Sequence, residues 1–294
     1  MEIRVLRYFV EVARECSLTR AAASLHVSQP TLSKQLKDLE RDLGCTLFTR
    51  TNYGIELTNE GMLLRRRAED ILEMVDKTED EFRSLDEIVG GDVRIGCAES
   101  QGIAHIARCI KAVQERNSHV RFHLYSGNAE DLSERIDSGL FDFAVLAQSP
   151  DPARYNGLEL PGADTWGVIM RSDSPLAQKE SVKLEDLTGL PLIFSREAVR
   201  DEYPRWFGDR VDGLNVVATY NLMLNASILV REGVGYAVSF DRLADTSPES
   251  GLTFRPLEPR LTSSLTVVWR KHQAFTPVAQ LLLDEMRARF AVKS

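Results

Sequence analysis

The opening segment of the chain repeats apolar residues with the period of a helix. A first helix with one buried face is predicted by apolar residues at positions i, i+3, i+4 and i+7: Leu6, Phe9, Val10 and Ala13. Residues 17–19 offer hydroxyl caps for a short second helix with small alanines at 21–23. Ser28 can cap a third helix, which Gly44 should end and whose buried face should carry four leucines: Leu32, Leu36, Leu39 and Leu43.

The face of the third helix opposite its leucines is polar and basic. It presents Pro30, Lys34, Lys37 and Arg41, with Gln29, Thr31 and Ser33 around the first turn. Hydroxyl and amide groups near a helix start can reach base edges in the major groove of DNA, and Lys or Arg can pair with phosphates. On periodicity alone, a structural three-helix bundle with a solvated face explains this pattern equally well.

A short hairpin is predicted next, because Leu47-Phe48 and Ile55-Glu56-Leu57 flank residues 51–54, in which Asn and Gly favour a turn. From Phe9 to Gly61 the sequence resembles the winged helix-turn-helix of LysR-type transcriptional regulators. The resemblance rests on Ala22-Ala23, Leu25, Val27-Ser28-Gln29-Pro30, Ser33, Leu39-Glu40, Leu43-Gly44, Leu47-Phe48, Arg50, Leu57-Thr58 and Gly61. It favours a DNA-binding head over the structural bundle.

The resemblance implies that the third helix enters the major groove. The contact residues it implies there are Gln29, Pro30, Thr31, Ser33 and Lys34. Lys37 extends this DNA-binding face, and Arg50 and the wing would face the backbone or the minor groove. Members of the family commonly carry Arg or Lys at the wing tip, where this chain has Asn52-Tyr53, so the contribution of the wing to affinity stays open.

A long helix is predicted after Thr58, since small or apolar residues recur at alternating steps of three and four over about four heptads. These residues are Gly61, Leu64, Ala68, Ile71, Val75, Thr78, Phe82, Leu85 and Val89. The seam must pack against a second copy of this helix or against the chain's own C-terminal domain. The resemblance implies a dimerising linker ending at Gly90-Gly91. Its expected dimer contacts are Ile71, Val75, Phe82 and Leu85.

From Asp92 onward, strands alternate with helices. We expect strands at 93–97, 120–125, 141–146, 165–170, 192–194, 214–218, 236–240 and 265–269, and helices at 102–115, 129–138, near 197–207, near 221–231 and at 277–290. Such units predict a parallel sheet with helices on both faces. The order resembles the two-lobed regulatory region of LysR-type regulators, which is similar to periplasmic binding proteins. It rests on residues 91–96, 138–142 and 232–236.

The expected fold class is therefore α+α/β, with three parts. A winged helix-turn-helix (1–57) and a linker helix (58–90) precede a two-lobed α/β effector domain (91–294) with lobe I at 92–160 and 265–294 and lobe II at 161–264. Small molecules bind such domains outside the carboxyl ends of strands, near helix N-termini.

Loops at these strand ends supply the candidate effector contacts. They are Ser100, Gln101, Ser126, Asn128, Phe194, Ser195, Arg196 and Phe240, with Phe194 and Phe240 as cleft walls. Ser100 and Asn128 can equally serve as helix caps. Arg196 can pair with a carboxylate effector or be an exposed charge, and Glu99 argues against assuming an anionic ligand.

Composition supports this organisation. The 294 residues suggest two domains at about 150 residues each. The net charge is −8, yet residues 1–67 carry 11 Lys and Arg against 8 Asp and Glu, so positive charge concentrates at the predicted DNA-binding end. No apolar run approaches the roughly 18 residues of a membrane span, so we expect a soluble bacterial protein of the cytoplasm.

Other functions fit less well. The sequence lacks G-x-S-x-G, H-E-x-x-H and P-loop motifs, and its five histidines and four cysteines are dispersed, so no enzyme, cofactor or metal site is expected. A thiol redox sensor would use Cys97 and Cys109, although an apolar setting at Cys109 suppresses reactivity. A stand-alone small-molecule binding protein would leave the head without a purpose.

The expected protein is a transcriptional regulator. Its expected partners are double-stranded promoter DNA, a small-molecule effector, further copies of itself in a dimer and a homotetramer, and RNA polymerase.

Overall fold

The computed structural model describes residues 1–51, 54–85, 90–147, 150–196, 206–208 and 213–290. The chain divides into two compact units, residues 1–83 and 84–294. Each unit has its own hydrophobic core. The expected wing tip at 52–53 and most of the helix expected near 197–207 lie outside the described residues.

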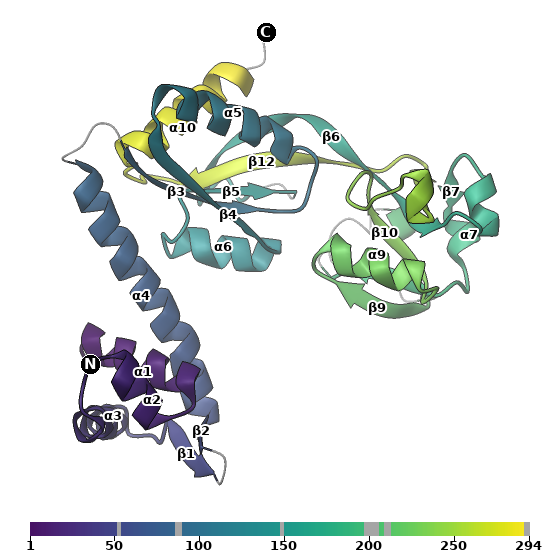
Figure 1. Ribbon diagram of the computed structural model, residues 1–294. Coiled ribbons are helices and arrows are strands. Elements are labelled where there is room, and N and C mark those ends of the chain that lie inside the picture. The colour runs from purple at the N-terminus through teal and green to yellow at the C-terminus, as the bar shows by residue number, and fades with distance from the viewer. Residues whose placement is uncertain (52–53, 86–89, 148–149, 197–205, 209–212, 291–294) are drawn as a thin grey trace. The chain divides into compact units, whose positions relative to one another are not determined.

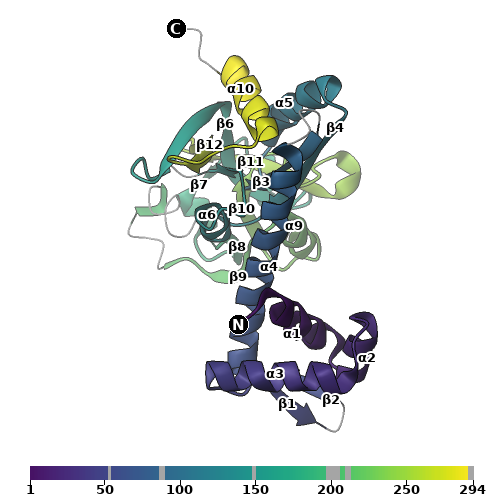
Figure 2. The same cartoon turned by 90° about the vertical axis from the view of Figure 1, so that its left-hand side faces the viewer.

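The N-terminal unit combines helices with one hairpin (Figures 1 and 2). Its elements are α1 (Ile3–Glu15), α2 (Leu18–Ser24), α3 (Gln29–Leu43), β1 (Phe48–Thr51), β2 (Gly54–Leu57) and α4 (Asn59–Leu85). The side chains of Ser17 and Ser28 cap α2 and α3 as predicted, and Gly44 ends α3 in the left-handed conformation. Leu43 is 42% exposed, so its expected burial is wrong, and Leu47 after the helix end is buried instead.

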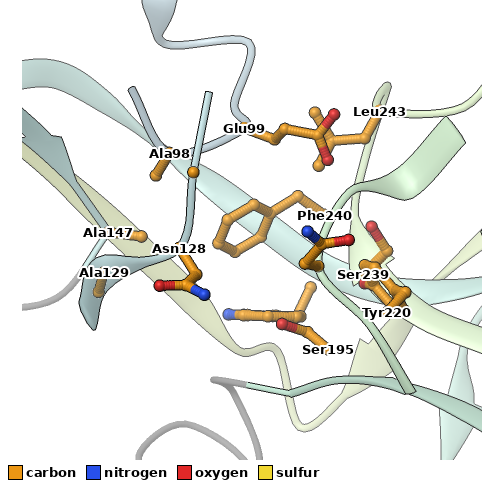
Figure 3. A pocket seen from close by; sticks show the side chains of 13 residues that line it. Ala98, Glu99, Asn128, Ala129, Ala147, Ser195, Tyr220, Ser239, Phe240 and Leu243 are labelled. Atoms are coloured by element: carbon orange, nitrogen blue, oxygen red, sulfur yellow. The ribbon is translucent and has the colours of Figure 1, made fainter. Parts of the chain in front are cut away.

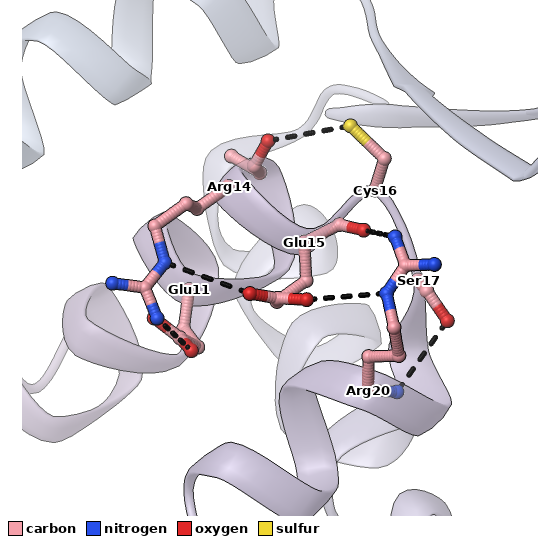
Figure 4. A network of polar contacts seen from close by, with 7 residues as sticks. Glu11, Arg14, Glu15, Cys16, Ser17 and Arg20 are labelled. Carbon is pink, nitrogen blue, oxygen red and sulfur yellow. Dashed lines mark hydrogen bonds and ion pairs between the residues drawn. The ribbon is translucent and has the colours of Figure 1, made fainter.

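A network of ion pairs holds the corner between α1 and α2 (Figure 4). The Glu15 carboxylate accepts from Arg20 Nε at 3.1 Å, and Arg14 reaches both Glu15 and, at 2.6 Å, Glu11. Cys16 adopts a left-handed conformation with φ 50° and ends α1. Exposed ion pairs contribute little stability individually, so this network mainly restricts the turn between the helices.

Polar contacts fix the hairpin to the helices around it. The Glu40 carboxylate of α3 accepts from the backbone N–H groups of Leu47, at 2.8 Å, and Phe48, at 3.3 Å. Thr58 caps α4 as predicted, since its Oγ1 accepts from Gly61 N at 2.9 Å. A Cβ at Gly61 would lie 2.2 Å from Leu47 O, so only glycine permits this close approach.

The first half of the predicted α4 seam belongs to the core of the N-terminal unit itself. Ala68 is buried there, and Ile71 is partly buried against the same cluster. Val75 is partly buried, whereas Phe82 is 68% exposed. The side chain of Leu85 and residue 89 lie outside the described part of the chain. Gly90 and Gly91 begin a strand, and the segment just before them, where the helix is expected to end, lies at residues 86–89, outside the described part of the chain.

The C-terminal unit is built from strands and helices in mixed order. Its described strands are β3 (Gly90–Cys97), β4 (His119–Ser126), β5 (Phe143–Leu146), β6 (Tyr155–Arg171), β7 (Val182–Lys183), β8 (Leu192–Ser195), β9 (Val216–Tyr220), β10 (Tyr236–Phe240), β11 (Leu252–Glu258) and β12 (Thr262–Arg270). Its described α-helices are α5 (Ile103–Arg116), α6 (Ala129–Asp137), α7 (Leu184–Leu187), α9 (Met223–Arg231) and α10 (Pro277–Phe290).

Two groups of parallel strands form the two lobes, and long antiparallel strands join them. The strand order is β4-β3-β5-β12-β6-β10-β8-β9, with β11 on β6. In lobe I, β3 pairs in parallel with β4 and with β5. In lobe II, β8 pairs in parallel with β9 and with β10. Strand β12 pairs with β5 and with β6 in the antiparallel sense. The expected parallel sheet is therefore mixed, because β6 and β12 run between the lobes. Both expected lobe boundaries fall inside these two strands.

Strand alternation explains the packing of lobe I. On β5, Phe143 and Val145 face the core under α5 and α10, whereas Ala144 and Leu146 face the core under α6. Figure 1 shows α5 and α10 on one face of this sheet and α6 on the other, as predicted. In lobe II the same alternation separates Val238 from Ala237, which packs against α9.

Candidate nucleic-acid interface and ligand cavity

The start of α3 presents an exposed polar surface. Gln29, Pro30 and Thr31 are exposed, and Ser33 is partly buried. The Ser28 hydroxyl accepts from Thr31 N at 3.3 Å and lies 2.8 Å from Thr31 Oγ1, which fixes the first turn. The structure therefore exposes three of these expected contact residues on the first turn of one helix.

Two lysines continue this surface along α3. Lys34 and Lys37 are exposed, and neither has an ion-pair partner among the described residues. Arg41 differs, because its Nη2 lies 2.8 Å from Asp38 Oδ1. Free ammonium groups on the same face as a capped helix start can pair with phosphates. Arg50 lies on β1 opposite Ile55, and its side chain is outside the described part of the chain.

A cavity lies where the carboxyl ends of the parallel strands of the two lobes meet (Figure 3). The space is about 610 Å³ when its open mouth is included. Its described lining residues are Ala98, Glu99, Gly127, Asn128, Ala129, Ala147, Trp166, Ser195, Tyr220, Asn221, Ser239, Phe240 and Leu243. This is the position at which α/β folds of this kind bind small molecules.

Three of the eight expected effector residues line this cavity: Asn128, Ser195 and Phe240. Asn128 also caps α6, because its Oδ1 accepts from Asp131 N at 2.7 Å. The side chains of Asn128 and Phe240 converge on the same space in Figure 3.

Ser100 and Gln101 do not line the cavity. Ser100 Oγ donates to Asp164 Oδ2 and accepts from Gly102 N, whereas Gln101 Nε2 donates to Arg242 O at 2.8 Å. Both residues therefore tie the segment after β3 to lobe II and to the crossing strand β6. Burial raises the pKa of Asp164, and the hydrogen bond from Ser100 offsets this only in part.

Phe194, Arg196 and Ser126 also lie away from the lining. Phe194 is completely buried and its ring lies 5.7 Å from that of Phe207, so its expected position as a cleft wall is wrong. Alternation along β8 explains this, because Phe194 shares the core-facing side with Leu192. Arg196 and Ser126 are exposed.

Glu99 is a charged residue that the expected set omitted, although its position was noted. One carboxylate oxygen accepts from Met223 N, at the start of α9, over 2.6 Å. Burial raises the pKa of Glu99, and this backbone hydrogen bond lowers it in part. A lobe I carboxylate therefore occupies a helix N-terminus of lobe II, where negative charge is favoured.

A buried hydroxyl pair forms another wall. Tyr220 donates to Val238 O at 2.8 Å, and burial raises its pKa while the neighbouring Ser239 hydroxyl acts in the opposite direction. Ser239 is 1% exposed, and its Oγ has no hydrogen bond of normal geometry to any described residue. Buried hydroxyl groups usually make a hydrogen bond, and a ligand in the cavity could supply one to Ser239.

Other chemistry finds little support in the described part of the chain. Cys97 and Cys109 are buried free thiols, and burial raises the pKa of Cys97 to about 12 and that of Cys109 to about 11. Among the described residues no group of three or more His, Cys, Asp or Glu could hold a metal. None of the described helices is long and apolar enough to cross a membrane.

Known proteins share both units. The sequence model described as LysR substrate binding domain matches residues 87–291, and the one described as bacterial regulatory helix-turn-helix protein, lysR family, matches residues 3–62. The chain is 33% identical to the HTH-type transcriptional regulator BsdA of Bacillus subtilis over 67% of each chain. It is 31% identical to the hydrogen peroxide-inducible genes activator of Dickeya chrysanthemi, over 69% of this chain and 67% of that protein.

Solved structures give the same fold. The crystal structure of CbnR, a LysR family transcriptional regulator, has a TM-score of 0.75 at 20% identity and covers 99% of both chains. CbnR in complex with its target DNA gives a TM-score of 0.74 at 20% identity and covers 98% of this chain and 99% of that chain.

A helix-turn-helix head joined to a two-lobed α/β domain with a cavity between its strand ends defines a DNA-binding regulator with a substrate-binding domain. The chain belongs to the LysR family of bacterial transcriptional regulators.

Proposed function

We propose that α3 reads DNA sequence in the major groove. The observation that carries this proposal is the capped, exposed first turn of α3 followed by two lysines without ion-pair partners. Gln29, Pro30, Thr31, Ser33 and Lys34 contact base edges and the adjacent backbone, and Lys37 and Arg50 contact phosphates. CbnR, whose fold this chain shares, has been crystallised with its target DNA.

The regulator acts as a dimer and assembles further into a homotetramer. Phe82, exposed on α4, and Val75, partly buried, lie in the half of the heptad seam beyond the residues that pack on the N-terminal core. In the proposed dimer Leu85 continues this contact, and Ile71 joins it from the edge of that core. In the C-terminal unit, Leu224 of α9 is 70% exposed, which offers a second apolar contact. Two heads on a dimer read half-sites about one DNA turn apart or multiples of it.

A small molecule in the cavity controls this DNA binding. The ligand contacts are Asn128, Ser195 and Phe240, with Glu99 and Ser239 added by the structure. Ser100, Gln101 and Arg196 act outside the cavity, the first two by holding the lobes together. A ligand that binds one arrangement of the lobes better than another shifts the population of DNA-bound states, and RNA polymerase at the promoter responds to that shift.

Thiol redox sensing is the second candidate, because a relative is named as a hydrogen peroxide-inducible activator. The reactive species of a cysteine is its thiolate. Burial keeps Cys97 and Cys109 protonated, so these two thiols do not support this function.

Fluorescence anisotropy with labelled promoter duplex tests the proposal. The full chain should bind promoter DNA at least about a thousandfold more tightly than random duplex, which is the range typical of specific regulators. The double variant Lys34→Ala, Lys37→Ala should lose most binding to both. A matched double variant of two exposed lysines in the C-terminal unit, Lys111→Ala and Lys271→Ala, should bind like the wild type. Equal losses in the two double variants would refute the assignment of α3.

A further inference from the structure

The cavity between the lobes carries its own negative charge. Among the described lining residues, Glu99 is the one with a charged side chain, and it is partly buried. Its hydrogen bond to Met223 N, at 2.6 Å, fixes the carboxylate at the wall. The same bond means that the first N–H group of α9 is already satisfied by a carboxylate of the protein.

This arrangement works against an anionic ligand. An anion would approach the charge of Glu99, and Met223 N would offer it no free donor. A carboxylate can accept about four hydrogen bonds, so Glu99 keeps acceptor capacity for the N–H donors of a ligand.

The aromatic wall suits a positively charged group as well. The Trp166 and Phe240 rings lie 4.2 Å apart at 52° to one another, and both residues line the cavity. Ring faces attract cations, most strongly where water is excluded, and these rings are buried.

Two polar side chains remain for the rest of a ligand. Ser239 Oγ is buried without a hydrogen bond of normal geometry, and leaving such a group unpaired has a cost that a bound ligand would remove. The Oδ1 of Asn128 is used by Asp131 N, which leaves the amide N–H donors of Asn128 for a ligand acceptor.

We propose that this cavity takes a small organic ammonium ion with an apolar or planar body, and that Glu99 selects its charge. The proposal rests on the proposed function, because it names the ligand class of the same cavity. The ammonium group binds the free acceptor sites of Glu99 and lies against the aromatic wall. Ser239 and Asn128 contact the remaining polar atoms.

Three probes of similar shape and different charge test the proposal: benzylamine, benzyl alcohol and benzoate. Isothermal titration with the full chain should give the tightest binding for benzylamine, about tenfold tighter than for benzyl alcohol, because hydrogen bonds to charged groups are the stronger ones. Benzoate should bind most weakly. Glu99→Gln keeps an oxygen that can accept from Met223 N, and it should weaken benzylamine binding about tenfold while leaving benzyl alcohol within twofold.

The control variant is Glu115→Gln, on the exposed surface of α5, which should bind all three probes as the wild type does. Three results would each overturn the proposal. Benzoate could bind as tightly as benzylamine, Glu99→Gln could keep the preference for benzylamine, or no probe could bind at 10 mM. DNA binding of the same preparations is measured without probe. If the wild-type protein shows no specific DNA binding, the proposed function is refuted. The preference for benzylamine over benzoate tests the ligand proposal for the cavity alone.

Discussion

Lys34 provides a quantitative test of how α3 meets DNA. Its side chain is exposed on the face of α3 that carries Gln29 and Thr31, and it has no ion-pair partner among the described residues. If it contacts a phosphate, Lys34→Ala removes one counterion-releasing contact from each recognition helix. Affinity should then fall for specific and random duplexes alike, because a phosphate carries no sequence information.

The size of the effect follows from polyelectrolyte theory. Each phosphate contact adds about 0.9 to the slope of log affinity against log salt concentration. A dimer carries two copies of Lys34, so the slope of the variant should be less steep by about 1.8. Between 50 and 200 mM salt, the ratio of wild-type to variant affinity should therefore fall about twelvefold.

Fluorescence anisotropy across a salt series measures this slope on the full chain. Arg41→Ala is the matched control, since Arg41 already pairs with Asp38 at 2.8 Å, and its slope should change by less. Gln29→Ala should instead weaken specific binding by about 30-fold or more and leave random duplex unchanged, because a dimer loses two bidentate base contacts that each discriminate by about 1–3 kcal/mol. An unchanged slope for Lys34→Ala would refute the phosphate contact.

Three further predictions concern stability and thiol reactivity. Gly61→Ala should destabilise the N-terminal unit by about 1–3 kcal/mol, because its Cβ would lie 2.2 Å from Leu47 O; an unchanged urea midpoint by circular dichroism would contradict this. Burial raises the pKa of Asp92, but the hydrogen bonds and charges of Arg121 and His123 together outweigh it and hold this pKa below its usual range. The stabilisation is therefore present above the unfolded pKa of about 3.9 and lost as pH falls through the folded value, so Asp92→Asn should cost about 1 kcal/mol at pH 7 and nothing at pH 2; a constant difference would count against it. Iodoacetamide at pH 8 should label exposed Cys16 while Cys97, whose pKa burial raises to about 12, stays unmodified by mass spectrometry; equal labelling would show that Cys97 is accessible.

Local features of the fold could be predicted because their causes are local. Ser17, Ser28, Thr58 and Asn128 each accept from a backbone N–H group within three residues, so the sequence around each is enough to predict the cap. Leu43 shows the limit of this approach. It continues the apolar repeat of α3 to the end of the helix, but the hydrophobic core does not extend that far, and Leu43 is exposed.

The cavity could be predicted only in part, since distant strands build it. Asn128 comes shortly after a parallel strand and Ser195 ends one, at positions that the sequence predicts. The same rule applied to the strand before Asn221 would have found that residue too. Trp166 and Ser239 lie within strands, and their position at the cavity depends on how the long strand β6 pairs with β10. No local pattern carries that information.

Glu99 and Ser100 illustrate the same limit. They are neighbours in one loop, yet Glu99 binds the start of α9 and lines the cavity, whereas Ser100 binds Asp164 of the crossing strand. Their positions in the loop are adjacent, and neither residue type by itself shows which of the two faces the cavity. Their different roles depend on the placement of lobe II, which comes from contacts more than sixty residues away along the chain.

Selection of bound duplexes from a random DNA library, followed by footprinting of the enriched sequence, asks whether this chain reads DNA sequence as a dimer. We predict enrichment of two related half-sites whose centres lie about 10 base pairs apart or multiples of it, both protected on one face of the duplex. Lys34→Ala should protect the same half-sites more weakly. A folded protein that binds the library at low salt but enriches no sequence would contradict the account.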